Sequence, residues 1–144
     1  MALIEAILAD NKFGMDIRDA DGHAMRMDIP VEQGGSGSGF RPMQSMLAAL
    51  CGCSSVDVIS ILEKQRQVLK GLKIEADGSR EEGKEPSLWK EIQIDFKLEG
   101  EVEASKAKRA VDLSLEKYCS VAETLRRAGA TITYSIYLNG SKID

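Results

Sequence analysis

Residues 42–58 read Pro-Met-Gln-Ser-Met-Leu-Ala-Ala-Leu-Cys-Gly-Cys-Ser-Ser-Val-Asp-Val, and this segment decides the fold. Pro42 suits the first turn of a helix, where its missing N–H would have no partner in any case. Apolar residues then recur at helical spacing, which predicts a helix of about seven to eight turns that reaches Lys70. The start of this helix is apolar around much of its circumference, which indicates that this end is buried. The periodic positions are Met43, Met46, Leu47, Leu50, Val58, Ile61, Leu62 and Leu69.

Strand patterns precede and follow this helix in the sequence. Apolar and polar residues alternate within residues 3–29, and Asp21-Gly22 supplies a hairpin turn between two such runs. Further strands are predicted at 72–79, 89–98 and 130–138, and the charged loop 80–86 joins the first two as a hairpin. A second helix is predicted from 104 to 128, and Gly129 is placed to end it. This order predicts one α+β domain over residues 1–144, with two long helices on antiparallel sheet.

The composition is that of an ordinary globular protein. The chain has 144 residues, of which 43% are hydrophobic and 29% charged, and this suits a single domain with a real core. A net charge of −4 argues against a nucleic-acid-binding surface, which needs clustered positive charge. We see no basic segment followed by a long apolar stretch near the start of the sequence, and we expect a cytoplasmic protein without a membrane partner.

The glycine-rich stretch 34–39 raises the question of phosphate binding. A phosphate-binding loop of the P-loop type needs a lysine and a serine or threonine after the glycines. Here Phe40-Arg41-Pro42 follows instead. The sequence therefore predicts a flexible connection ahead of the long helix.

The candidate chemistry rests on cysteines. With one histidine, His23, a multi-histidine metal site is not expected, and we expect no metal and no cofactor. Cys51 and Cys53 are separated by roughly 200° around a helix, so they cannot easily join in a disulfide or bind one metal ion. Free cysteine is often a buried small hydrophobe, which is the expectation for Cys51. For Cys53 the spacing does not decide between two interpretations, a buried structural thiol and a reactive thiol.

Cys119 precedes Ser120-Val-Ala-Glu123, which has the form of a capping box. If the second helix breaks here, Cys119 lies at the N-terminal edge of a new helix. The N–H dipoles there would stabilise a thiolate and lower the pKa of Cys119. If the helix is continuous, the serine is simply solvated. The pattern leaves both arrangements open.

Both cysteine segments, in this order and with this spacing, resemble the OsmC/Ohr family, and within it the OsmC-like branch. The likeness runs from the glycine-rich loop to Val58, resumes at 116–121 and closes with the strand after Gly129. It implies an OsmC-like fold in an intertwined homodimer with the long helices at its centre. It also implies that Cys53 is the peroxidatic cysteine, which attacks an organic hydroperoxide and becomes a sulfenic acid, and that Cys119 is the resolving cysteine. A small dithiol or a lipoylated protein would reduce the resulting disulfide, and Cys51 inherits no role.

The sequence departs from this family at the start of the long helix. The Ohr and OsmC enzymes have a glutamate just after the proline, where this chain has Met43. Gln44 follows, where the OsmC-like branch often has glutamate, and it is the candidate substrate-binding residue. An amide cannot pair ionically with the catalytic arginine of those enzymes, and neither Arg18 nor Arg26 has the family's local pattern. Two functions therefore stay open, a thiol-dependent peroxidase and an OsmC-fold protein that binds a small hydrophobic ligand.

Overall fold

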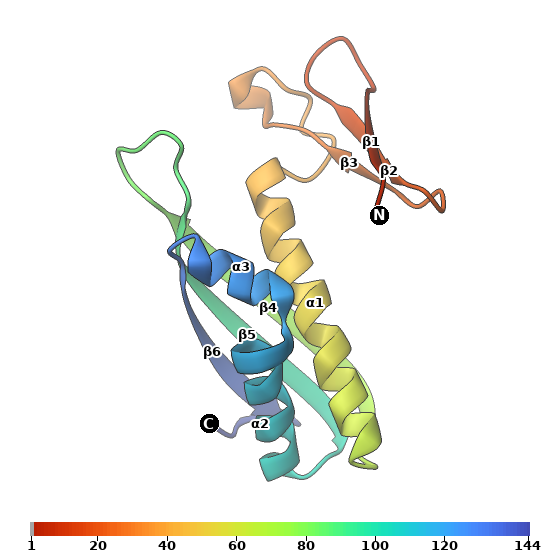
Figure 1. The fold of residues 1–144 in the computed structure, drawn as a ribbon, viewed down its shortest axis with the longest axis vertical. Coiled ribbons are helices and arrows are strands. Elements are labelled where there is room, and N and C mark those ends of the chain that lie inside the picture. Colours follow the sequence, from red (N-terminus) through yellow and green to blue (C-terminus); the bar gives the residue numbers. More distant parts are fainter. Residues whose placement is uncertain (1) are drawn as a thin grey trace. The chain divides into compact units, whose positions relative to one another are not determined.

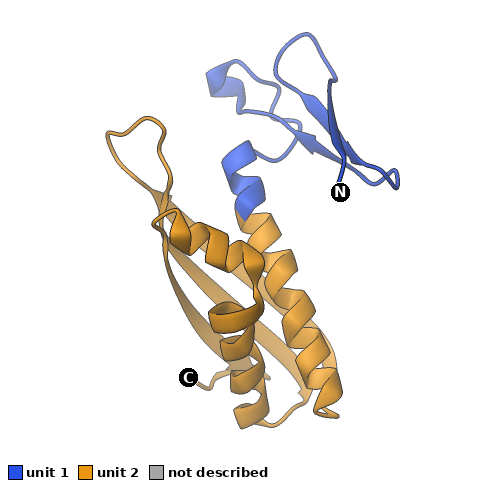
Figure 2. Cartoon of the chain, in the orientation of Figure 1, with its two compact units in different colours: residues 1–46 blue, residues 47–144 orange. Residues whose placement is uncertain are grey.

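The computed structural model describes residues 2–144, and its contacts divide the chain into two compact units, residues 1–46 and 47–144 (Figure 2). The first unit holds an antiparallel three-stranded sheet of order β1-β2-β3. Gly22, with a φ of +88°, lies in the turn between β2 and β3, which confirms the predicted hairpin. The elements of this unit ahead of the long helix are β1 (Ile4–Leu8), β2 (Met15–Asp19), β3 (Ala24–Met27) and the 3-10 helix η1 (Val31–Gln33).

The second unit packs helices on a four-stranded sheet of order β4-β5-β6-β7 (Figure 1). The predicted hairpin of β4 and β5 is confirmed, but β5 and β6 run parallel, not antiparallel as expected throughout. The helical connection between β5 and β6 returns the chain to the same end of the sheet, which makes this pair parallel. The elements are α1 (Pro42–Lys64), which begins in the first unit, β4 (Val68–Arg80), β5 (Trp89–Glu101), α2 (Ala104–Leu113), the π-helical turn η2 (Ser114–Tyr118), α3 (Ser120–Arg127), β6 (Thr131–Leu138) and β7 (Ser141–Lys142).

The core of the second unit lies between this sheet and the helices. The predicted apolar face of β5 is confirmed, since Ile92, Ile94 and Phe96 are at most 1% exposed. Truncating such a side chain as Phe96 to alanine costs roughly 3–5 kcal/mol. The buried stripe of α1 consists of Leu47, Leu50, Ser54, Val58 and Leu62, and Cys51 and Cys53 are both half-buried.

The long helix ends earlier than the sequence predicts. It stops at Lys64, and Leu69, predicted to be helical, lies in β4. Arg66 has a φ of +58°, and Gln67 N–H donates to the carbonyl of Leu62 at 2.9 Å, which is a left-handed helix cap. Glycine usually occupies that position because other residues are strained there by about 1–2 kcal/mol. Arginine in its place left the sequence without a stop signal.

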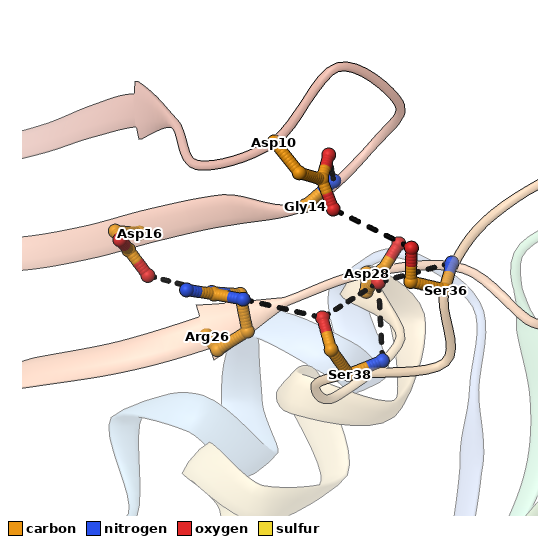
Figure 3. Close-up of polar contacts among 7 residues, drawn as sticks. All are labelled: Asp10, Gly14, Asp16, Arg26, Asp28, Ser36 and Ser38. Atoms are coloured by element: carbon orange, nitrogen blue, oxygen red, sulfur yellow. Dashed lines mark hydrogen bonds and ion pairs between the residues drawn. The ribbon is translucent and has the colours of Figure 1, made fainter.

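The glycine-rich loop is held in place by a carboxylate, contrary to the expected flexible connection (Figure 3). Asp28 is 2% exposed, and its Oδ2 accepts hydrogen bonds from Ser38 Oγ at 2.7 Å, Ser38 N at 3.1 Å and Ser36 N at 3.3 Å. The backbone N–H groups that could have bound a phosphate are therefore already paired with an anion from the same chain. Gly35 packs so tightly that a Cβ there would lie 2.2 Å from the carbonyl oxygen of Ile29.

Asp28 should make the stability of this loop depend on pH. Hydrogen bonds from Ser38, first from its N–H, lower the pKa of Asp28 from 3.8 to about 2. A lowered pKa in the folded state stabilises the protein above the ordinary pKa, and this stabilisation is lost as the pH falls toward about 2. We expect Asp28→Asn to unfold more readily than the parent at neutral pH, with the difference shrinking below about pH 4. Urea unfolding at several pH values measures this, and a difference independent of pH would contradict it.

Helix α1 is unusually apolar for its burial. By length and composition alone, the helix could cross a membrane. An 18-residue window of it has a mean hydropathy of 1.8, and 22% of that window is buried. This is weak evidence for a membrane span, because core helices of soluble proteins meet the same criterion. Its buried stripe packs into the core of the second unit, which accounts for part of its apolar character. Val56 and Ile59 remain 66% and 47% exposed.

Candidate active site

The second predicted helix is interrupted at Cys119. Helix α2 ends at Leu113, the π-helical turn η2 follows, and α3 starts at Ser120. Cys119 is the N-cap of α3, and its Sγ accepts a hydrogen bond from Ala122 N at 3.4 Å. Of the two arrangements left open by the sequence, the structure has the break. The capping box that Ser120 and Glu123 could have formed is absent, because the N-cap is Cys119 and not Ser120, and Glu123 pairs with Arg127 at 2.9 Å.

The fold brings Cys53 and Cys119 together. Cys53 is half-buried on α1, Cys119 is 3% exposed, and the Cys53 thiol is near enough to contribute to the raised pKa of Cys119. Cys51 points about 200° away around the same helix and is not part of this pair. A half-buried sulfur beside a buried one is an arrangement in which the more accessible thiol can react with a solute and the buried one can then bond to it.

Burial decides the protonation of Cys119. It raises the pKa of this thiol to about 11, against the lowering contribution of the Ala122 N–H, and the hydrogen bond and charge of Cys53 raise it further. The prediction that a helix N-terminus would lower this pKa is therefore wrong, because desolvation of the charged form exceeds the effect of the N–H groups. Burial also raises the pKa of Cys51. Cys51 and Cys119 are both thiols at neutral pH, and a thiolate at Cys53 disfavours a second one at Cys119.

Sequence reasoning missed a buried serine next to this pair. Ser114 is 0% exposed, and its Oγ donates to Asp57 Oδ2 at 2.9 Å and to the carbonyl of Ser54 at 3.1 Å. The carbonyl of Ser114 accepts the N–H of Cys119 at 2.7 Å. Asp57 and Ser54 share a turn of α1 with Cys53, while Ser114 is far away in the sequence. No local signal could have joined them.

The other candidate residues lie in the first unit. Gln44 and Arg18 are exposed there, and the role of Gln44 stays a prediction. Arg26 on β3 donates from Nε to Asp16 Oδ1 at 2.6 Å and from Nη1 to Ser38 Oγ at 3.3 Å (Figure 3). The hydrogen bond with Asp16 raises the pKa of this guanidinium, which therefore stays charged.

Among residues 2–144, one group of side chains has spacing suited to a metal ion. Ligand atoms of Asp19, Asp21 and His23 lie within 4.8 Å of one another at the β2–β3 turn. The Asp19 carboxylate already accepts hydrogen bonds from the N–H groups of Asp21 and His23, and it contacts His23 Nδ1 at 2.9 Å. Turn formation accounts for this cluster, and we assign it no metal.

Comparison with known proteins places the chain in a family. The model of the family described as OsmC-like protein matches residues 35–135, which include both cysteines of the pair. Protein YhfA of Escherichia coli is 41% identical over 118 residues, which cover 81% of this chain and 83% of that protein.

Solved structures extend the likeness to the whole fold. A hypothetical protein from Aquifex aeolicus is 31% identical with a TM-score of 0.79, covering 96% of this chain and 98% of that one. An organic hydroperoxide resistance protein OsmC from Legionella pneumophila has the same fold at 17% identity, with a TM-score of 0.68 and coverage of 95% and 96%. The resemblance inferred from the two cysteine segments is confirmed, and the chain belongs to the OsmC-like family.

Proposed function

We propose that this protein is a thiol-dependent peroxidase that reduces organic hydroperoxides in the cytoplasm. The observation that carries the proposal is the proximity of half-buried Cys53 on α1 to buried Cys119 at the start of α3. The name of the Legionella relative, an organic hydroperoxide resistance protein, supports the same class of reaction. An apolar ligand site alone would not require two thiols to meet.

The proposed reaction has three steps. The Cys53 thiolate attacks an oxygen of the hydroperoxide, the O–O bond breaks, and the alkoxide takes up a proton and leaves as an alcohol, while Cys53 becomes a sulfenic acid. Cys119, after losing its proton, attacks the Cys53 sulfur, so that the S–S bond forms, the S–O bond breaks and water leaves. A small dithiol or the lipoyl group of a protein then reduces the disulfide by exchange.

The first test of this function is the stoichiometry of thiol loss. One equivalent of an organic hydroperoxide should remove two thiols from the parent, as Cys53 and Cys119 become a disulfide, and none from Cys53→Ser on the same timescale. Thiol titration after brief exposure to cumene hydroperoxide measures this. Equal thiol loss in both proteins would exclude the proposed peroxidase activity and favour an OsmC-fold protein that binds a hydrophobic ligand.

We also propose that the protein is an intertwined homodimer. None of the large apolar side chains within residues 2–46 is buried, and those of β1 are more than half exposed. Strand β4 is an edge of its sheet, and its outer side has no strand partner among the described residues. Exposed apolar surface and long open edges are usually covered in native proteins, and a second copy of the chain is the commonest partner.

Sedimentation equilibrium should therefore show a dimer at micromolar concentration. Replacing two exposed apolar residues of β1, as in Ile4→Lys with Ile7→Lys, should shift the equilibrium toward the monomer, because burying an unpaired charge is costly. The matched control is Val31→Lys, an exposed apolar residue of the 3-10 helix η1. A parent protein that sediments as a monomer would exclude the intertwined dimer.

A further inference from the structure

We infer that Ser114 is a positioning residue, which with Asp57 holds Cys119 beside Cys53 for disulfide formation. The inference rests on the proposed peroxidase pair and names the groups that set its geometry. Buried polar side chains are uncommon because each must find a partner, and Asp28, Ser54 and Ser114 are the buried polar residues among residues 2–144. Two of these three lie beside the cysteine pair.

Ser114 connects the backbone of Cys119 to the helix that carries Cys53. Its carbonyl accepts the Cys119 N–H at 2.7 Å, which is the i to i+5 bond of the π-helical turn. Its hydroxyl has one proton, which it shares between Asp57 Oδ2 at 2.9 Å and the Ser54 carbonyl at 3.1 Å. Both acceptors lie within one turn of Cys53 on α1. Three hydrogen bonds therefore link one cysteine to the helical turn of the other.

The π-helical turn explains why such a link is needed. A wide turn of this kind interrupts the regular hydrogen bonding of a helix and is a local departure found often at functional sites. Here it ends the helical run at Tyr118, so that Cys119 caps α3 with its sulfur instead of lying inside a helix. Arg126 Nη1 also donates to the carbonyl of Leu115, which ties the turn to α3. The Ser114 hydroxyl provides the corresponding tie to α1.

Removing the hydroxyl should slow disulfide closure without slowing the first oxidation. In a Cys51→Ser background, we expect Ser114→Ala to leave the rate of Cys53 oxidation by cumene hydroperoxide within about twofold of the parent, because the Ser114 hydroxyl donates to Asp57 and Ser54 and not to the attacking sulfur. Closure of the Cys53–Cys119 disulfide should be about tenfold slower, as expected for the loss of a hydrogen bond to a charged acceptor. Trapping of the sulfenic acid with dimedone, followed by mass spectrometry, separates the two steps.

Asp57 supplies a conservative variant. Asp57→Asn keeps an acceptor oxygen and should close the disulfide within about threefold of the parent, whereas Asp57→Ala should resemble Ser114→Ala. The double variant should be no slower than either single one, because both remove the same link. Asp57 is half-buried, so these variants test the link even if Ser114→Ala does not fold.

Ser54→Ala is the matched control. The Ser54 Oγ donates to the carbonyl of Leu50 at 2.8 Å, so the substitution removes a buried hydroxyl from α1, the helix that carries Cys53. The Ser54 carbonyl, which Ser114 contacts, is kept. We expect a loss of stability but unchanged closure. Slowing by Ser54→Ala equal to that by Ser114→Ala, or unchanged closure in Ser114→Ala, would overturn the inference.

A second readout does not depend on peroxide. In a glutathione redox buffer, the equilibrium constant for forming the Cys53–Cys119 disulfide reports how well the two thiols are positioned. Ser114→Ala should lower it about tenfold, a shift of about 30 mV in the reduction potential. If the parent does not react with hydroperoxide, the proposed peroxidase fails while this equilibrium still tests the link. If Ser114→Ala leaves the equilibrium constant for the Cys53–Cys119 disulfide unchanged, the positioning role of Ser114 is contradicted, whether or not the protein reduces hydroperoxides.

Discussion

Closure of the Cys53–Cys119 disulfide should accelerate steeply with pH. Burial is the largest cause of the raised pKa of Cys119, about 11, and it remains when Cys53 has become a sulfenic acid. The attacking species is the thiolate, whose fraction rises tenfold per pH unit well below the pKa. The rate of closure should therefore increase about a hundredfold from about pH 6 to about pH 8.

This dependence can be measured by rapid mixing with one equivalent of cumene hydroperoxide, acid quenching at timed intervals and mass spectrometry of the alkylated protein. The Cys51→Ser variant serves as the parent, so that two thiols are followed. A rate of closure that stays constant over this range would show that ionisation of Cys119 does not limit it. A plateau near neutral pH would show that the pKa of Cys119 falls once Cys53 is oxidised.

Replacing Cys119 by serine should stop turnover but spare the first oxidation. Serine is a preferred N-cap residue and can accept the Ala122 N–H as the sulfur does, so α3 should remain formed. Without a resolving thiol, the Cys53 sulfenic acid persists and can be oxidised further to a sulfinic acid. Peroxide consumption driven by a dithiol should fall about a hundredfold or more if direct reduction of the sulfenic acid is slow.

The control for this variant is Cys51→Ser, which removes the third thiol. Cys51 faces about 200° away from Cys53, so turnover should stay within about twofold of the parent. The two measurements are steady-state peroxide consumption with dihydrolipoamide and peptide mapping of the oxidised protein. A Cys51–Cys53 disulfide, or oxidation at Cys51 alone, would overturn the assignment of Cys53 and Cys119.

The order and type of the main elements could be predicted from the sequence because they depend on local patterns. The alternation of Ile92, Ile94 and Phe96 defines the buried face of β5, and helical spacing defines α1. The likeness of the cysteine segments to a known family added the expected pairing of Cys53 with Cys119, which no local pattern contains. The C-terminal end of α1 is predicted wrongly, because Arg66 adopts a positive φ where no glycine signals a stop. The sequence leaves the break in the second helical run open, because a π-helical turn before Cys119 has no clear local signature.

The sequence by itself therefore determined the α+β class, the strands and helices around the core, and the two cysteines that carry the candidate chemistry. The tertiary structure alone decided the protonation of Cys119, because burial, which raises its pKa, depends on what α3 packs against. It also decided that Asp28 pairs with the glycine-rich loop and that Ser114 links η2 to Asp57. Hydrogen bonds of this kind join residues far apart in the chain, and a buried polar group is stable only where the fold supplies its partner.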